Sequence, residues 1–373
     1  MRILHVTDCY LPLLGGIEVQ VRQLALHQRA AGHDVRILTA TPRERGGHGL
    51  SQEDDDGVRV YRMAARMPAG VPVHPWPVPH ARRLLTRLRP DVVHLHMGGV
   101  TPSTQAVMPL VGRLGIPAVV TVHSVWSPRT AVPFYAALDR LLGWSGWPLT
   151  LTAVSELAAR PVRRAARPGT EVHVLRNGVD VMEWRRPPLP RASSAVHAVT
   201  AGRFAPRKRM MPLLEALRRA GELLPDDALE VTIAGAGPQL GDAEAFLAEH
   251  GMTGWVHLPG RLSRADLIEL YRRADVYLAP GVQDAFSVAV QEAQAAGLAI
   301  VSRAQSGAAE LLTEGVDGLL ADDDAALAHQ LARLVTDRAL LGRITAHNRT
   351  VPPTTTWATV LGATEDMYRR AGA

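Results

Sequence analysis

The sequence predicts an α/β protein of two doubly wound domains, each a parallel sheet covered by helices on both faces. Its 373 residues exceed what one ordinary core accommodates. Short apolar runs alternate with helical patterns, and such runs are typical of parallel strands buried on both sides. The alternation restarts after a Pro-rich, polar segment at 185–194, so we place the linker there. The predicted domains are residues 1–184 and 195–353.

Composition narrows the class of protein. Apolar residues make up 47% of the chain and charged residues 21%, which is ample for a folded core and argues against disorder. Cys9 is the only cysteine, so no internal disulfide can form. The start MRILHVTD reads as a strand and lacks the layout of a signal peptide, and no apolar run is long enough to span a membrane. These features predict a cytoplasmic protein.

Charge is uneven along the chain. Residues 1–183 hold 21 Lys/Arg and 14 Asp/Glu, a balance of +7, whereas residues 184–373 hold 20 and 22, a balance of −2. The first half therefore favours anionic partners such as phosphates or acidic lipid head groups. Nucleic acid is not expected, because no basic run is interleaved with aromatic residues.

Residue choice is biased as well. Of 41 basic residues only Lys208 is lysine, and Asn177 and Asn348 are the only asparagines. A lysine or asparagine that is retained despite this bias is a stronger candidate for a functional residue.

The strands predicted in the first half precede three features at the sheet edge where such folds bind ligands. Gly15-Gly16 lets backbone amides approach a phosphate, or forms an ordinary tight turn. His123 borders a reaction site, or makes a structural hydrogen bond. His94 and His96 point the same way along a strand, but no third ligand is evident, so hydrogen-bonded histidines are favoured over a metal pair. The strands predicted here are 3–6, 35–39, 58–63, 92–96, 118–122 and 149–154.

Three charged segments have a functional interpretation beside a structural one. The helical pattern carrying Arg82, Arg83, Arg87 and Arg89 follows a stiff Pro-rich loop at 67–80, and suits either an anionic membrane surface or, as we favour, a solvated helix face. The aspartate runs 54–56 and 322–324 resemble metal sites. We interpret the first as a polar loop before a strand and the second as the start of a helix.

The second half repeats the pattern, with strands expected at 197–201, 229–234, 255–258, 276–279 and 299–302. Arg203 and Lys208 follow the first of these strands. Two cations at the mouth of a strand–loop–helix unit can neutralise a diphosphate without a metal. Ser263 and Asp266 begin a helix as a capping pair.

The segment 279–310 is the one around which the chain is organised. A loop with Asp284 and Phe286 leads into a helix that begins near Ser287, a good N-cap, and stops at Gly297. The amides of the first turn form an anion site. Glu292 lies eight residues beyond Asp284, so the two carboxylates suit separate parts of one long ligand rather than one shared proton.

These residues carry a family resemblance that spans nearly the whole chain. The motifs are GGIE at 15–18, VHLH at 93–96, TVH at 121–123, AVSEL at 153–157, NGVD at 177–180, AGRFAPRK at 201–208, IAGAGP at 233–238, LPGRL at 258–262, DAFSVAVQEA at 284–293 and SGAAELL at 306–312. In this order the chain resembles the retaining glycosyltransferases of family 4. The resemblance implies a GT-B fold, in which two Rossmann-like domains face a cleft, and a C-terminal helix, 354–373, that returns to the first domain.

The resemblance also implies roles. Arg203 and Lys208 would hold the donor diphosphate and stabilise the leaving group, Asp284 would hold the transferred sugar, and His123 would lie beside it. Glu292 would bind the ribose. The implied donor-binding set is Gly15, Gly16, Asn177, Gly202, Gly237, Arg261, Leu262, Phe286, Ser287, Val288 and Glu292, with no metal ligand and no cofactor. The family has glutamate where Asp284 stands, glycine at Ser287 and proline at Arg176, and these departures concern the choice of sugar.

The expected function is therefore metal-independent, retaining transfer of a hexosyl group from GDP-mannose or a UDP-sugar to a lipid, glycan or small-molecule alcohol. Such a reaction suits cell-envelope or glycoconjugate biosynthesis. The acceptor is expected on the first domain, with peripheral contact to an anionic membrane as an accompanying hypothesis. The alternatives are a nucleotide-sugar epimerase and a donor-binding protein without turnover. A dehydrogenase is disfavoured, because neither half has G-x-G-x-x-G after its first strand.

Overall fold

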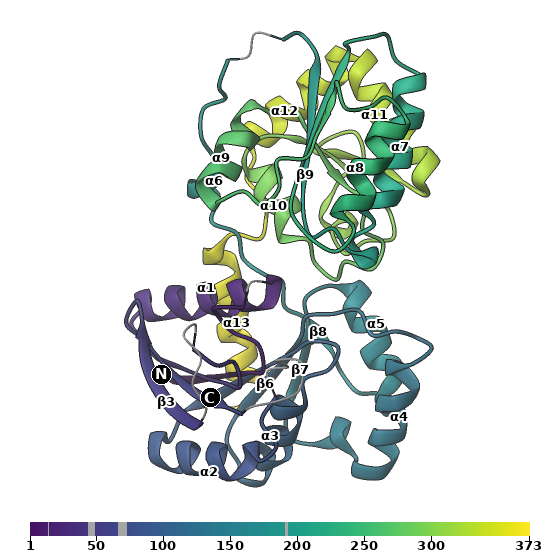
Figure 1. The fold of residues 1–373 in the computed structure, drawn as a ribbon. Coiled ribbons are helices and arrows are strands. Elements are labelled where there is room, and N and C mark those ends of the chain that lie inside the picture. The colour runs from purple at the N-terminus through teal and green to yellow at the C-terminus, as the bar shows by residue number, and fades with distance from the viewer. Residues whose placement is uncertain (14, 44–48, 66–72, 191–192) are drawn as a thin grey trace. The chain divides into compact units, whose positions relative to one another are not determined.

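The computed structural model describes residues 1–13, 15–43, 49–65, 73–190 and 193–373 (Figure 1). The chain divides into two compact units. Unit 1 comprises Met1–Gly178 and Trp357–Ala373, and unit 2 comprises Val179–Thr356. The boundary expected from the sequence, residue 184, lies six residues later than the observed one. The reason is Trp184, which is buried in unit 2 with its ring 5.2 Å from that of Tyr271.

Unit 1 is built on an eight-stranded sheet in the order β3-β4-β2-β1-β5-β6-β7-β8. Every pair of neighbours is parallel except β3 with β4, which form an antiparallel edge. The strands are β1 Arg2–Thr7, β2 Asp34–Thr39, β3 Gly49–Asp55, β4 Val58–Ala64, β5 Val92–Met97, β6 Ala118–Val122, β7 Thr150–Ala153 and β8 His173–Val174. The predicted parallel sheet is thus confirmed, and the sequence analysis missed β3 and β8.

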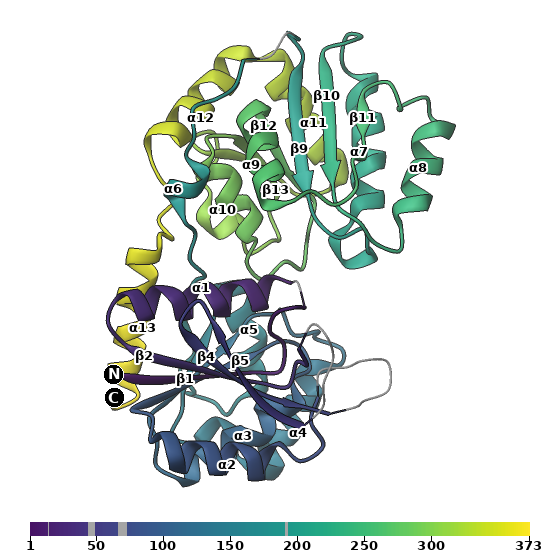
Figure 2. The same ribbon diagram turned by 60° about the vertical axis from the view of Figure 1, so that its left-hand side comes forward.

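The helices of unit 1 cover both faces of this sheet. They are α1 Gly16–Ala30, α2 Pro77–Leu88, α3 Pro102–Arg113, α4 Ala131–Leu142, α5 Glu156–Ala165 and α13 Trp357–Arg370. Helices α1 and α13 lie together on one face, and α2 and α3 lie on the other (Figure 2). Tyr368 of α13 is fully buried in the same cluster as Ile3 of β1 and Val21 of α1, so the C-terminal helix completes this core.

Unit 2 has a six-stranded, entirely parallel sheet in the order β11-β10-β9-β12-β13-β14. Its strands are β9 Val196–Ala201, β10 Leu229–Ala234, β11 Val256–His257, β12 Val276–Ala279, β13 Ala299–Arg303 and β14 Gly318–Ala321. Its helices are α6 Val181–Trp184, α7 Met210–Glu222, α8 Leu240–Glu249, α9 Arg264–Arg273, α10 Val288–Ala295, α11 Asp324–Thr336 and α12 Arg338–Thr350. One core packs α7, α8 and α11 against the sheet, and a second packs α9 and α10 on its opposite face (Figure 1). The predicted doubly wound architecture is confirmed in both units.

The two aspartate runs have different outcomes. Asp54 and Asp55 lie within β3, so the prediction of a loop is wrong there. The carboxylate of Asp55 accepts a hydrogen bond from the hydroxyl of Tyr10 and forms an ion pair with Arg22 at 2.9 Å. The second run does begin a helix, because the side chain of Asp323 accepts from the N–H of Ala326.

The Pro-rich segment is only partly described. Residues 67–72 lie outside the described residues, and the segment that follows turns helical at Pro77, earlier than the loop predicted to residue 80. Proline suits the first turn of a helix, where its missing N–H has no partner to lose. Within the described residues, no helix combines the length and apolar character that crossing a membrane requires.

Candidate functional site

A cavity of about 50 Å³ opens in unit 2 beside the carboxyl end of β12. Lys208, Asp284 and Ser287 line it. They come from segments far apart in the sequence, the loop after β9 and the loop between β12 and α10. The structure therefore gathers three of the predicted residues at the strand ends, where ligands of parallel sheets bind.

An ion pair joins two of these residues. The Nζ of Lys208 donates to Oδ2 of Asp284 over 3.0 Å, with the lysine side chain 42% and the aspartate side chain 21% exposed. Lys208 ends a short 3₁₀ turn, Pro206–Lys208, and Arg209 after it adopts a left-handed conformation that starts α7. Arg203 is exposed in the same loop and makes no ion pair with the residues that the structure describes. Its guanidinium is thus available to a ligand.

The backbone at Asp284 is held by Gly307, a residue that the sequence analysis did not single out. The N–H of Gly307 donates to the carbonyl of Asp284 over 2.9 Å. A Cβ added at Gly307 would lie 2.0 Å from the carbonyl oxygen of Ala285, so only glycine fits without moving this loop. Its motif SGAAELL carried the family resemblance, and that motif was the available signal.

The start of α10 agrees with the prediction in position but not in every contact. Ser287 is the N-cap and Val288 the first helical residue, yet the Ser287 side chain makes no capping hydrogen bond within the described structure. Phe286 is buried and anchors the turn. Gly297 has φ +89° and ends the helix as predicted. The first-turn amides of α10 remain the part of this turn suited to an anion.

Glu292 lies one turn into α10, away from the cavity lining, and contacts Arg264. The Nη1 of Arg264 lies 3.3 Å from Oε1 of Glu292, and the same guanidinium binds Glu183 at 2.6 Å and stacks 5.0 Å from the ring of Trp184. Burial raises the pKa of Glu292 to about 7, and Arg264 offsets only part of that effect. Arg264 was not among the predicted residues.

This raised pKa predicts a pH-dependent cost to stability. The folded pKa lies above the ordinary 4.5, so the stabilising contribution of the protonated group is complete below pH 4.5 and is lost as the pH rises through 7. We therefore expect Glu292→Gln to match the parent at pH 5 and to exceed its free energy of unfolding at pH 8. The difference should be at most about 3.5 kcal/mol, at about 1.4 kcal/mol per pKa unit. Urea unfolding at both values of pH measures it.

Glu244→Gln is the matched control, because Glu244 is an exposed glutamate of α8. It should leave the pH profile of stability unchanged. If Glu292→Gln were only as stable as the parent at pH 8, the buried charge of Glu292 would have no net cost to stability.

The predicted glycines of unit 2 lie where two loops touch. The N–H of Gly202 donates to the carbonyl of Ala234 over 2.9 Å. A Cβ added at Gly237 would lie 2.3 Å from the carbonyl oxygen of Phe204, so this glycine serves close packing of the loops after β9 and β10. Arg261 is exposed and Leu262 half-buried in the loop after β11, and neither lines the cavity.

In unit 1, Gly15 and Gly16 begin α1. Gly15 is the N-cap, in an extended conformation, and Gly16 is the first helical residue. A Cβ on Gly15 would meet the Glu18 carboxylate at 2.5 Å, whereas one on Gly16 would meet nothing within 4 Å. The exposed amides here begin a 15-residue helix, so they can attract an anion.

His123 and Asn177 share a second, smaller cavity of about 20 Å³ in unit 1. The neighbouring Gly178 is fixed from two sides. Gln20 of α1 exchanges hydrogen bonds with its N–H and carbonyl at 3.1 and 3.0 Å, and a Cβ on it would strike the ring of Trp357 at 2.5 Å. The loop that carries Asn177 is therefore rigidly placed beside His123.

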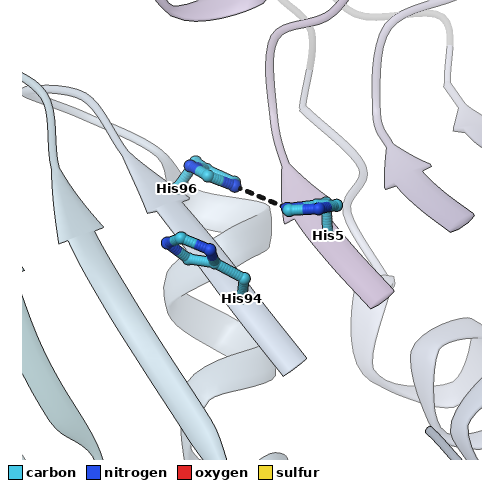
Figure 3. A group of neighbouring side chains, drawn as sticks. All are labelled: His5, His94 and His96. Atoms are coloured by element: carbon cyan, nitrogen blue, oxygen red, sulfur yellow. Dashed lines mark hydrogen bonds between the residues drawn. The ribbon is translucent and has the colours of Figure 1, made fainter. Parts of the chain in front are cut away.

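The histidine pair has a third member that the sequence analysis missed. His94 and His96 stack with ring centres 4.2 Å apart, as expected from their spacing. The statement that no third ligand is evident is wrong, because His5 of β1 lies beside them (Figure 3). β1 pairs with β5 and places His5 opposite His94. The ring nitrogens come close enough to share a metal ion, but each imidazole bonds to other protein groups.

Of the two rare asparagines, Asn348 is structural. Its amide donates to the carbonyls of Leu298 and Asp317 at 2.7 and 2.8 Å in the core of unit 2. Rarity therefore identified cavity-lining residues in Lys208 and Asn177, and a core hydrogen bond in Asn348.

The family model described as Glycosyltransferase Family 4 matches residues 14–183, and that described as Glycosyl transferases group 1 matches residues 195–337. A glycogen synthase from Mycobacterium tuberculosis is 28% identical over 402 residues, covering 100% of this chain and 95% of that protein. A GDP-mannose-dependent alpha-mannosyltransferase from the same organism is 28% identical over 375 residues, covering 92% and 93%.

Solved structures agree on the fold. The Anabaena protein HepE, in complex with UDP, matches with a TM-score of 0.76 at 16% identity, covering 99% of this chain and 100% of that one.

Proposed function

We propose that this chain, which belongs to the glycosyltransferases of the GT-B fold, transfers a hexosyl group from a nucleoside diphosphate sugar to an alcohol acceptor. The transfer would retain the anomeric configuration and would need no metal. The observation that carries the proposal is the ion pair of Lys208 with Asp284 beside the first turn of α10. A cation, a carboxylate and the N-terminal end of α10 meet there at one cavity.

Each group suits one part of a sugar nucleotide. Arg203 and Lys208 would neutralise the diphosphate and stabilise it as it leaves with the bonding electrons. Asp284 would accept hydrogen bonds from sugar hydroxyls and favour positive charge at the anomeric carbon. Glu292 would accept from the ribose hydroxyls, and His123 would contact the transferred sugar.

Two donors have support from the comparisons. One relative is named for its dependence on GDP-mannose, and a structural neighbour was solved with UDP. Thermal shift with UDP, GDP, UDP-glucose and GDP-mannose distinguishes them, because only a bound ligand raises the melting temperature.

Product analysis then tests the reaction itself. A retaining transferase releases nucleoside diphosphate only when acceptor is present, and its product keeps the anomeric configuration of the donor. Conversion of the donor to a different sugar nucleotide would indicate an epimerase instead. Stable binding with no product across lipid, glycan and small-alcohol acceptors would indicate a binding protein.

We further propose that an anionic acceptor binds along α2. Arg82, Arg83 and Arg87 are exposed on this helix, whereas Leu84 and Leu85 are buried, so the helix presents charge rather than an apolar face. Trp76, just before the helix, is 72% exposed, and tryptophan favours the interface between water and lipid. The observed exposure is compatible with peripheral contact to an anionic membrane.

Replacing Arg82, Arg83 and Arg87 by Ser should raise the KM for an anionic lipid acceptor roughly tenfold or more, since each basic residue near an anionic surface contributes about 1 kcal/mol. The Kd for the donor should not change. Steady-state kinetics with vesicle-embedded acceptor measures the first, and calorimetry the second.

The control removes the same number of exposed charges from unit 2, at Arg333, Arg343 and Arg349. An acceptor KM that stays at the parent value in the α2 variant would remove this surface from consideration.

A further inference from the structure

Eight hydrogen bonds link side chains of unit 1, all buried except the half-buried His123, into one continuous hydrogen-bond chain. It begins at His123, at the small cavity, and ends at the backbone carbonyl of Val120 in the sheet. In order, the members are His123, His96, His5, Gln28, Tyr368, His94, Thr121, Thr152 and the Val120 carbonyl, with donor–acceptor distances of 2.7 to 3.0 Å. Figure 3 shows the link between His96 and His5, with His94 beside them.

The far end of this chain sets the direction of its protons. A carbonyl oxygen can only accept, so the hydroxyl of Thr152 donates to Val120. Thr152 has no second proton, so Thr121 donates to it over 2.7 Å. The hydroxyl of Thr121 has then donated its only proton, so His94 must donate to it from Nε2.

The remaining donors and acceptors, from His94 to His5, are fixed in the same way. A neutral His94 with its proton on Nε2 accepts at Nδ1, so Tyr368 donates there, and the NH₂ group of Gln28 donates to Tyr368. The carbonyl of that amide then faces His5 and accepts from its Nε2–H. His5 accepts at Nδ1 from Nε2–H of His96.

The last link determines the tautomer of His123. His96 accepts at Nδ1, so His123 donates from Nε2, over 3.0 Å. The Nδ1 of His123 is left with a bare lone pair. That atom is buried and has no hydrogen-bond partner among the described residues.

The reverse direction does not satisfy the chain. If His94 accepted from Thr121, the threonine pair would have one proton left for two contacts, the one between the hydroxyls and the one to Val120. One oxygen pair at 2.7 or 3.0 Å would then lack a proton. Burial favours neutral imidazoles, because it lowers the pKa of His5 and of His123 to about 4 and the pKa values of His94 and His96 well below 6.5.

The hydrogen-bond chain also explains why His5, His94 and His96 cluster without a metal ion. All six of their ring nitrogens lie within hydrogen-bond distance of Gln28, Tyr368, Thr121, His123 or one another. A metal ion would have to displace those bonds to reach three lone pairs.

We propose that this buried chain, anchored at the Val120 carbonyl and passing through Tyr368 of the C-terminal helix, holds His123 in its Nε2–H tautomer, with Nδ1 as a hydrogen-bond acceptor for a ligand hydroxyl. Thr152, Thr121, His94, Tyr368, Gln28, His5 and His96 are positioning residues. That the hydroxyl belongs to the transferred sugar rests on the proposed function; the tautomer does not.

NMR of protein labelled with ¹⁵N at histidine reads the tautomer directly, because protonated and bare ring nitrogens have widely separated shifts. The His123 resonances are those lost in His123→Gln. We expect a bare Nδ1 and a protonated Nε2 in the parent. Tyr368→Phe breaks the chain at its middle and Thr152→Val at its anchor. In both variants, the hydrogen bonds that remain between His123 and the substituted residue can all be formed in either direction of proton donation. The tautomer of His123 with Nδ1–H should therefore appear. Thr152→Ser keeps the hydroxyl and should retain the parent spectrum.

Activity gives a second readout. With the donor identified by thermal shift, Thr152→Val should lower kcat/KM by up to about tenfold, the worth of one hydrogen bond, while Thr152→Ser should not. A deoxyfluoro donor that loses the hydroxyl facing Nδ1 should be a poor substrate of the parent, since fluorine cannot donate.

A protonated Nδ1 in the parent, or an unchanged His123 spectrum in folded Thr152→Val and Tyr368→Phe, would overturn the inference. If the tautomer shifts as expected but no sugar is transferred, the proposed function fails and the hydrogen-bond chain stands.

Discussion

Lys208→Ala should lower kcat by about 10²- to 10³-fold while the protein stays folded. Lys208 is the cation beside Asp284 at the cavity of unit 2, and removing one preorganised donor from a developing negative charge costs about 3–4 kcal/mol in the transition state. Partly exposed ion pairs contribute only about 0–1 kcal/mol to stability, so the melting temperature should change little. Single-turnover transfer and thermal unfolding measure the two quantities.

Lys208→Arg makes the test sharper. The chain uses arginine at 40 of its 41 basic positions, so a lysine kept here indicates a need for its compact ammonium group. Arginine presents a broad planar fork instead, and we expect this variant to stay well below the parent although its charge is unchanged. Arg207→Ala, which removes the exposed neighbouring cation, is the control and should be active.

The same site predicts that a chelator leaves turnover unchanged, because the side-chain cations would neutralise the leaving diphosphate. Loss of activity in EDTA that returns with Mn²⁺ would contradict metal independence. Full activity of Lys208→Ala would contradict the placement of the leaving group.

Asp284→Glu should reduce kcat about 10²-fold, although glutamate is the residue that the family resemblance implies at this position. The carboxylate of Asp284 already meets Lys208 at 3.0 Å, and its backbone is held by Gly307. An added methylene would move the charge by about 1 Å, and a shift of that size in a reacting group can cost ~10²-fold.

Asp284→Asn separates two roles of the carboxylate. It keeps the shape and removes the charge. A large fall in kcat with little change in KM would identify stabilisation of charge in the transition state, whereas a higher KM alone would identify plain sugar binding. Gln283→Ala, an exposed neighbour, is the control. Parent-like turnover in both Asp284 variants would mean that Asp284 is an ordinary loop residue.

Patterns that act over a few residues were readable in the sequence. Ser263 accepts from the N–H of Asp266 three positions later, and Gly297 takes the left-handed conformation that stops α10. The parallel strands followed from their apolar runs for the same reason, since burial on both faces leaves a local signature. Doubly wound topology then placed the loops with Lys208 and Asp284 at strand ends.

Contacts between distant segments were decided only by the tertiary structure. Lys208 and Asp284 lie 76 positions apart, Gly307 reaches Asp284 from after β13, and His5 meets His96 across 91 positions because β1 pairs with β5. The apolar runs of β1 and β5 specify that each is a buried strand, but not which strand is its neighbour. Strand order is chosen by the packing of the whole sheet and its helices. The tautomer of His123 depends on strand order, because the hydrogen bonds that determine it run through five separate elements and the C-terminal helix.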